Sequence, residues 1–217
     1  MPSFRVRASR ARIDEKRVMP SPVIYYIRHG ETAWNAEGRF QGSRDIPLNE
    51  RGRAQAAAAG GILRDLIARA THKAHHLGYV SSPLTRARTT MDLLRGALGL
   101  PTDGYAVEHR LREIGWGEWE GLTVPEMQAH DPVTFAARRR DRWNVTAPKG
   151  ETYAEVTTRM RAWLHELTSD TVAVAHGGTM RALMVATGVA STLEAVEAQV
   201  EQGVVYVFAN GALSKHG

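Results

Sequence analysis

Cysteine is absent from this 217-residue sequence. Disulfide bridges, a thiolate nucleophile and cysteine-ligated zinc are therefore excluded. Long hydrophobic runs are also missing, because no apolar stretch approaches the roughly 20 residues that a helix needs to cross a bilayer. We therefore expect a protein of the cytoplasm that makes no use of a membrane. Hydrophobic residues still make up 43% of the chain, which is enough to build a full core.

Net positive charge is scarce outside one end of the chain, although the formal net charge of the whole chain is +5. Residues 1–18 hold six Lys or Arg and two Asp or Glu, which accounts for +4 of that total. A basic tail on a nearly neutral body has the composition of a nucleic-acid arm or a targeting peptide, but it lacks the apolar core of a secretory signal. We interpret residues 1–20 as a disordered basic extension, with Met19 as an alternative start, and expect no nucleic-acid partner.

Apolar runs typical of strands alternate with helical patterns along the rest of the chain. The expected strands cover residues 23–27, 77–80, 171–175 and 204–208, and the expected helices cover residues 49–70, 85–98, 151–167 and 180–187. This alternation predicts an α/β fold with a largely parallel sheet in one domain, residues 21–217. The polar segment at about 120–150 is expected to form a helical cap over that domain.

Polar side chains follow three of the expected strands. Arg28 and His29 follow the first strand, Arg86 comes shortly after the second, and His176 follows the strand at 171–175. The carboxyl ends of parallel strands meet along one edge of an open sheet, where ligands bind. Guanidinium forks and helix N-termini both favour tetrahedral anions. The sequence therefore predicts a phosphate pocket at this edge.

Two histidines and two arginines around one phosphate indicate covalent catalysis. A neutral imidazole can attack phosphorus and carry the phosphoryl group, while the guanidinium groups hold the phosphoryl oxygens. This design needs neither a metal ion nor a cofactor. The group formed by His72, His75 and His76 has no acidic partner nearby in the sequence, and we interpret it as a solvated loop rather than a metal site.

A leaving alkoxide also needs a proton, which a carboxyl group can supply as a general acid. The stretch LREIGWGEWEG at 111–121 offers Glu113, Glu118 and Glu120. Their spacing alone does not select one of them.

Four separated motifs closely resemble the histidine phosphatase superfamily, the phosphoglycerate mutase-like or RHG family. The similarity runs in order from about residue 23 to residue 210. The motifs are IRHGETAWN with GRFQGSRDIPLNERGRAQA, then SSPLTRARTT, LREIGWGEWEG and VAHGG. The resemblance implies a three-layer α/β/α sandwich with a mostly parallel central sheet.

The resemblance also implies catalytic roles for matching positions. His29 would be the nucleophile that becomes phosphorylated, and Arg28 would bind the phosphoryl group beside it. Arg86 would be the second arginine of the pocket, and His176 would bind phosphoryl oxygens. Glu113 would be the proton donor, so the resemblance selects among the three glutamates.

Further positions match residues around the phosphate in that family. Asn35 would contact the phosphate, while Thr32, Gln41 and Gly42 would line the mouth of the pocket. Apart from the resemblance, Gly177 follows the strand at 171–175 and would let the backbone come close to the bound anion.

The family contains both phosphatases and mutases. The short distance between the glutamate motif and PKGE at 148–151 favours a phosphatase that acts on a small phosphorylated metabolite. A cofactor-dependent phosphoglycerate mutase and an inactive phosphate-binding protein remain the alternatives. Four arginines in the expected cap lie either on an exposed helix face or at the pocket mouth, where they would grip a second anionic group; these are Arg138, Arg139, Arg140 and Arg142. The sequence leaves the oligomeric state open, with a homodimer as one option.

Overall fold

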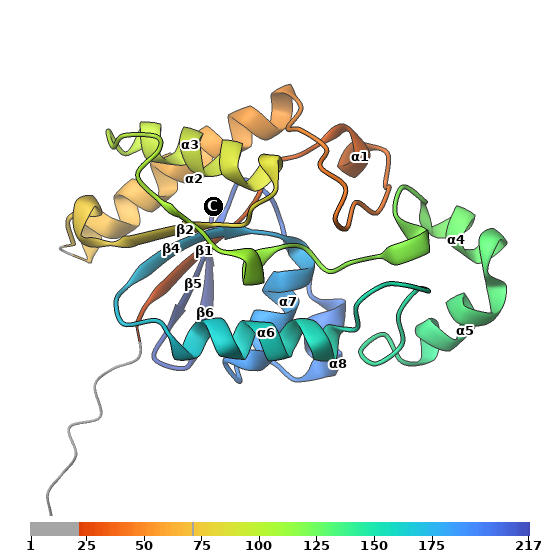
Figure 1. Ribbon diagram of the computed structural model, residues 1–217. Coiled ribbons are helices and arrows are strands. Elements are labelled where there is room, and N and C mark those ends of the chain that lie inside the picture. The colour runs from red at the N-terminus through yellow and green to blue at the C-terminus, as the bar shows by residue number, and fades with distance from the viewer. Residues whose placement is uncertain (1–21, 71) are drawn as a thin grey trace, which may run out of the picture.

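The computed structural model describes residues 22–70 and 72–217. The predicted extension at residues 1–20 lies outside the described residues. A six-stranded sheet stands between two layers of helices, as Figure 1 shows. The predicted α/β/α sandwich is therefore confirmed.

The sheet has the strand order β3-β2-β4-β1-β5-β6. The strands are β1 (Ile24–Arg28), β2 (Gly78–Ser81), β3 (Ala106–Val107), β4 (Thr171–Ala175), β5 (Val205–Ala209) and β6 (Ala212–His216). The first four positions in this order run parallel, whereas β5 and β6 are antiparallel to their neighbours. The largely parallel sheet was thus predicted correctly.

Strand β6 was not predicted from the sequence. It pairs with β5 through a tight turn at Asn210 and Gly211, which both have positive φ values of 52° and 72°. Asn-Gly is the preferred pair for such a hairpin turn, so this dipeptide was the available signal. The strand lacks the apolar run of a buried strand because most of its side chains are exposed.

One face of the sheet is covered by α2 (Glu50–Arg69) and α3 (Thr85–Ala97) (Figure 1). Alternate residues of the central strands point to this face, including Tyr25 and Ile27 of β1 and Val172 of β4. They pack with buried residues such as Leu63 of α2 and Met91 of α3. The period-two alternation of strand side chains therefore builds one core on this face.

The opposite face is covered by α6 (Tyr153–His165), α7 (Gly177–Ala186) and α8 (Thr192–Glu197). Tyr26, Ala173 and Ala175 point to this side and pack with Met160 and Leu183. Helix α7 begins three residues before the predicted position, because two glycines open it. Glycine is a poor helix former, so the sequence pattern hides this first turn.

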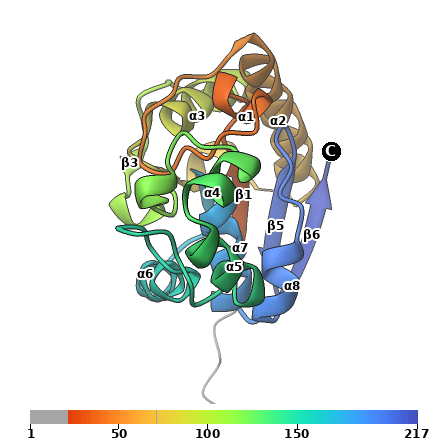
Figure 2. The ribbon, with the colours of Figure 1, turned by 90° about the vertical axis from the view of Figure 1, so that its right-hand side faces the viewer.

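Three helices lie beyond the carboxyl ends of the parallel strands, nearest the viewer in Figure 2. They are α1 (Ala33–Ala36), α4 (Val124–His130) and α5 (Pro132–Arg140). Short 3₁₀ turns occur at Ala74–His76, His109–Leu111 and Gly117–Trp119. Within the described part of the chain, no helix is both long and apolar enough to span a bilayer.

Candidate active site

His29 lies directly after β1 and is 2% exposed. Its Nδ1 is 2.7 Å from the carbonyl oxygen of Gly30. Because a carbonyl oxygen only accepts, Nδ1 carries the proton and Nε2 keeps a free lone pair. Burial, followed by the charges of Arg86 and Arg28, lowers the pKa of His29 well below its ordinary value. The ring is thus held neutral in one tautomer.

Two guanidinium groups flank this imidazole. Arg28 ends β1 and donates to the carbonyl of Val200 at 2.7 Å, while its buried Nε has no acceptor among the described residues. Arg86 is fully buried in the first turn of α3 and its Nε is likewise without a described acceptor. Burial is the main cause that lowers the pKa of Arg86, to about 10. Both groups therefore retain donor capacity for an anion.

His176 stands between β4 and α7, and its ring centroid is 5.1 Å from that of His29. Its Nε2 forms a hydrogen bond of 2.7 Å with the hydroxyl oxygen of Ser82, at the end of β2. Its Nδ1 is buried and has no partner among the described residues. Burial is again the main cause that lowers the pKa of His176. Ser82 was not predicted to orient this ring.

The structure separates the three candidate glutamates. Glu113 lines the cavity, and its Oε1 accepts from the backbone N–H of Gly178 at 2.9 Å. Glu120 is held by the backbone and hydroxyl of Ser43, and Glu118 pairs with Lys149 at 3.0 Å on the surface. A Cβ at Gly178 would lie 2.4 Å from Glu113 Oε1 and 2.5 Å from Cγ2 of Ile114, so a larger residue there would displace both side chains.

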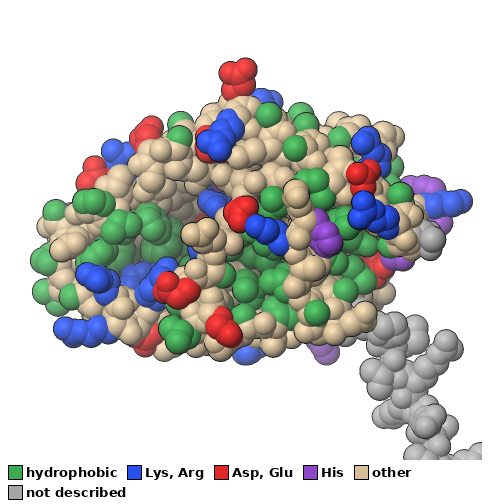
Figure 3. All heavy atoms as spheres, turned by 180° about the vertical axis from the view of Figure 1, so that it is seen from behind, with side chains coloured by type: hydrophobic (Ala, Val, Ile, Leu, Met, Phe, Trp, Pro, Cys, Tyr) green, Lys and Arg blue, Asp and Glu red, His purple; other side chains and the backbone are tan. Residues whose placement is uncertain are grey.

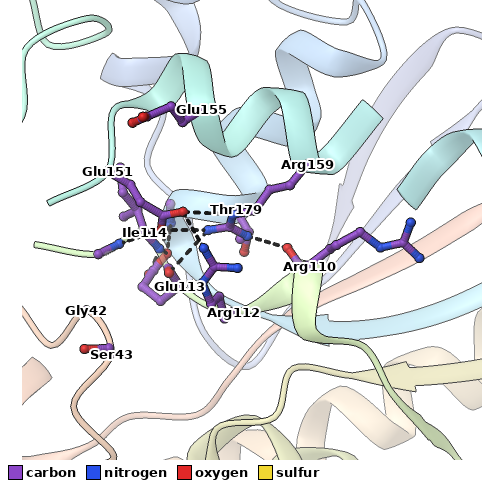
Figure 4. A network of polar contacts seen from close by, with 12 residues as sticks. Gly42, Ser43, Arg110, Arg112, Glu113, Ile114, Glu151, Glu155, Arg159 and Thr179 are labelled. Atoms are coloured by element: carbon purple, nitrogen blue, oxygen red, sulfur yellow. Dashed lines mark hydrogen bonds and ion pairs between the residues drawn. The ribbon is translucent and has the colours of Figure 1, made fainter. Parts of the chain in front are cut away.

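A partly buried ion-pair network supports the backbone of Glu113 from α6, as Figure 4 shows. Arg159 donates to the carbonyl oxygens of Glu113 and Arg110, and it pairs with Glu151 at 3.3 Å. Glu151 also pairs with Arg112 at 2.7 Å and accepts from the N–H of Gly115. Sequence reasoning missed this network. Charged residues on both sides of a predicted turn were the available signal, but nothing in their spacing pairs them.

Asn35 lines the cavity from α1. Its Oδ1 accepts from the backbone N–H of Thr32 at 3.2 Å and from Gln202 at 3.0 Å, whereas no described residue accepts from its amide nitrogen. Thr32 is buried and caps α1 instead of lining the cavity. Thr32 was predicted to line the mouth of the pocket, but its side chain is used to cap α1 and does not line the cavity.

The cavity has a volume of about 260 Å³ and includes the predicted positions Gln41, Gly42 and Gly177 in its wall. The carbonyl of Gly42 accepts from Arg86 at 2.9 Å, and its φ of 52° favours glycine. Arg181 of α7 also lines the cavity and was missed by sequence reasoning. Its signal was weak, because a single arginine in an apolar helix has many structural uses.

The four cap arginines have different environments. Arg138 is 7% exposed, and its guanidinium lies 4.6 Å from the centroid of Trp116. Arg138, Arg139 and Arg142 line a second hollow beside the cavity, and Arg140 is exposed elsewhere on α5. The four arginines therefore form neither a uniformly exposed helix face nor a single binding site for a second anionic group.

The histidine group at residues 72–76 does have an acidic neighbour, contrary to the sequence reading. Nδ1 of His72 lies 3.6 Å from a carboxylate oxygen of Asp170, which is 98 positions further along the chain. No group of three or more His, Cys, Asp or Glu that could hold a metal ion occurs within residues 22–70 and 72–217.

These side chains make the cavity strongly cationic. Arg28, Arg86 and Arg181 face it together with one carboxyl group, that of Glu113. The position at the strand ends, the neutral imidazole and the excess of guanidinium groups indicate an enzyme of phosphoryl transfer.

The chain belongs to the histidine phosphatase superfamily (branch 1), whose family model matches residues 24–212. A glucosyl-3-phosphoglycerate phosphatase of Mycolicibacterium vanbaalenii is 37% identical over 177 residues, covering 75% of this chain and 72% of that protein. A 2,3-bisphosphoglycerate-dependent phosphoglycerate mutase of Gloeobacter violaceus is 27% identical, covering 88% of this chain and 86% of that protein. The solved structure of a mycobacterial glucosyl-3-phosphoglycerate phosphatase with VO3 superposes on this chain with a TM-score of 0.73 at 29% sequence identity. The superposition covers 89% of this chain and 96% of that chain. The predicted family and enzyme class are confirmed.

The lowered pKa values predict that His29 and His176 stay neutral in mildly acidic solution. Burial and nearby arginines disfavour the protonated ring, so protonation begins only well below the ordinary pKa of 6.5. We expect imidazole nitrogen shifts of neutral rings for both residues at about pH 5.5. An NMR titration measures these shifts, with each signal assigned by its loss in His29→Asn or His176→Asn. Signals that titrate near pH 6.5 would contradict the electrostatics described.

Proposed function

We propose that the protein hydrolyses phosphomonoesters of small metabolites through a phosphohistidine intermediate. The observation that carries this proposal is the neutral tautomer of His29, whose Nδ1 donates to the Gly30 carbonyl. His29, whose Nε2 keeps the free lone pair, is part of the wall of the cationic cavity. This is the state that a histidine nucleophile needs.

In the first step, Arg28, Arg86 and the amide nitrogen of Asn35 bind the phosphoryl oxygens, and His176 donates through its unpartnered nitrogen. Nε2 of His29 attacks phosphorus, and the bond from phosphorus to the ester oxygen breaks. Glu113 gives its proton to the departing alkoxide, so the alcohol leaves neutral. The guanidinium groups stabilise the charge on the transferring phosphoryl group.

In the second step, water takes the place of the alcohol. The ionised Glu113 accepts a proton from this water as it attacks phosphorus, and the bond from phosphorus to Nε2 breaks. Inorganic phosphate is released and His29 returns to its neutral form. The proton that Glu113 loses in the first step is thus regained in the second step.

The substrate is proposed to be a phosphate ester that bears a carboxylate. Two observations support this class: the relatives that are 37% identical are glucosyl-3-phosphoglycerate phosphatases, and the cavity adjoins further arginines in the cap. Glyceric acid esters carry a carboxylate close to the phosphate, which suits such a cationic surface.

Phosphate release from a panel of esters tests the proposal. The panel contains p-nitrophenyl phosphate, 3-phosphoglycerate and sugar phosphates, and EDTA is present because the proposed pocket uses no metal ion. We expect release that EDTA leaves unchanged. A strict metal requirement would contradict the pocket chemistry. No release, together with phosphoryl exchange when bisphosphoglycerate is added, would favour the mutase alternative, and binding without either reaction would favour a phosphate-binding protein.

We expect Glu113→Gln to slow alkyl phosphates more than aryl phosphates, because an aryl oxide leaves without a full proton transfer. The expected loss is about 10²–10⁴-fold in kcat/KM for 3-phosphoglycerate and clearly smaller for p-nitrophenyl phosphate. Glu118→Gln is the matched control, since this neighbour pairs with Lys149 outside the cavity. Equal losses on both esters would remove Glu113 as the acid.

Other sequence predictions stay predictions. They are the cap at about 120–150 as part of a domain spanning 21–217, the cytoplasmic location, the lack of a nucleic-acid partner and the option of a homodimer.

A further inference from the structure

A second hollow of about 460 Å³ lies beside the catalytic cavity. Phe40 and Trp116 belong to the walls of both, so the two spaces are neighbours. The remaining wall comes largely from the cap, including Met127 of α4 and Phe135 of α5. On the face seen in Figure 3, hydrophobic side chains gather in a hollow whose lower margin carries Lys or Arg and acidic side chains.

The apolar wall of this second hollow is aromatic and well supported. Phe40 and Trp116 meet edge to face, with ring centroids 4.4 Å apart. The guanidinium of Arg138 stacks on Trp116 and donates to the carbonyls of Arg142 and Val145, which fixes the ring in place. Fixed aromatic faces of this kind bind rings and other apolar carbon skeletons at low entropic cost.

The charge at the margin of the second hollow is not balanced. Arg142 pairs with Glu197 of α8 at 2.7 Å, and Glu197 is the acidic residue in this wall. Arg139 is exposed and pairs with no carboxylate among the described residues. Since Arg138 is used for packing, Arg139 and Arg142 are the groups available to a ligand. An anionic group is the complement of this margin.

We infer that the second hollow binds the alcohol portion of the phosphate ester, with its carbon skeleton against Phe40 and Trp116 and a carboxylate near Arg139 and Arg142. This inference rests on the proposed function, because the phosphoryl group must occupy the neighbouring cavity. Glu197 holds Arg142 in the free protein and competes with the ligand for it. The ion pair between cap and α8 thereby tunes the preference for anionic substrates.

Two synthetic esters of nearly equal shape test this inference: 4-carboxyphenyl phosphate and 4-carbamoylphenyl phosphate. The first carries the anionic group and the second carries a neutral amide in its place. We expect Arg139→Gln and Arg142→Gln each to raise KM for the carboxylate ester about three- to tenfold, with little change for the amide ester. Arg140→Gln is the matched control, because it removes an exposed arginine of α5 outside the hollow.

Glu197→Gln is expected to act in the opposite direction. Loss of this carboxylate frees Arg142, so KM for the carboxylate ester should fall about two- to fivefold while the amide ester is unaffected. If the ion pair had only a structural role, its loss would weaken the binding of both esters to the same extent. The opposite signs expected for Arg142→Gln and Glu197→Gln therefore separate ligand binding from cap stability.

Unchanged KM values in both arginine variants would overturn the inference, and so would equal losses on the two esters. Calorimetric binding of both esters to His29→Ala keeps the test independent of turnover. If the carboxylate ester binds more tightly than the amide ester and this preference requires Arg139, the inference about the second hollow is supported. This holds even if the wild type releases no phosphate, because the lack of release would refute only the proposed chemistry. Binding without such preference would overturn the inference by itself.

Discussion

Replacing His29 by alanine should lower kcat/KM for phosphomonoester hydrolysis by at least about 10⁴-fold, the size of loss seen when a nucleophile is removed. The neighbouring His176 is not expected to take over the attack, because its Nε2 bonds with Ser82 and its buried Nδ1 is the nitrogen proposed to donate to the phosphoryl group. Phosphate release measured by a continuous assay gives the magnitude. His75→Ala, which removes an exposed histidine, is the matched control and should leave the rate unchanged.

A second measurement detects the phosphohistidine intermediate itself, rather than the loss of activity. The wild-type protein, quenched during turnover, should carry one phosphoryl group on His29, bound through an acid-labile bond from phosphorus to nitrogen. His29→Ala should carry none while unfolding at a similar temperature. Substantial hydrolysis by the alanine variant, or phosphoryl transfer to another residue, would refute the nucleophile assignment.

Arg86→Lys should lower kcat/KM by about 10²–10³-fold although the positive charge is kept. The buried guanidinium spans two loop carbonyls, those of Arg44 at 2.6 Å and Gly42 at 2.9 Å, and still has donor capacity toward the cavity. A single ammonium group lacks the forked geometry needed to hold this loop and a phosphoryl oxygen together. The steady-state rate on 3-phosphoglycerate measures the loss.

Arg88→Lys is the control for this prediction, because Arg88 lies on the same helix with its side chain exposed. It should retain wild-type kinetics. Inhibition by inorganic phosphate distinguishes a lost phosphate contact from a displaced loop: weaker inhibition in Arg86→Lys is expected. Wild-type kcat/KM and inhibition in that variant would exclude Arg86 from phosphate binding.

The strands and the residues that follow them could be read from the sequence. Buried parallel strands are continuous apolar runs, and polar residues at their carboxyl ends stand out against such runs. Hence Arg28, His29 and His176 were found with their place in the fold. Strand β6 and the first turn of α7 were missed, because an exposed edge strand and a pair of glycines carry no hydrophobic pattern.

Partners that are distant in the sequence could not be read in this way. His176 and Ser82 are 94 positions apart, and Glu113 and Gly178 are 65 apart. No local pattern distinguishes Arg138, buried on Trp116, from Arg139, which is exposed one position later. A helix turns by about 100° per residue, so the packing of α5 decides which arginine is buried.

The sequence by itself determined the class of this protein: an α/β sheet whose strand ends carry the arginines and histidines of a phosphoryl-transfer site. Hydrophobic periodicity and turn residues are local properties, and they suffice for that result. The tertiary structure alone decided which nitrogen of each histidine is free, which backbone group holds the Glu113 carboxylate at the cavity and which cap arginine is buried against Trp116. These features depend on hydrogen bonds, burial and charge between segments that meet only when the chain folds.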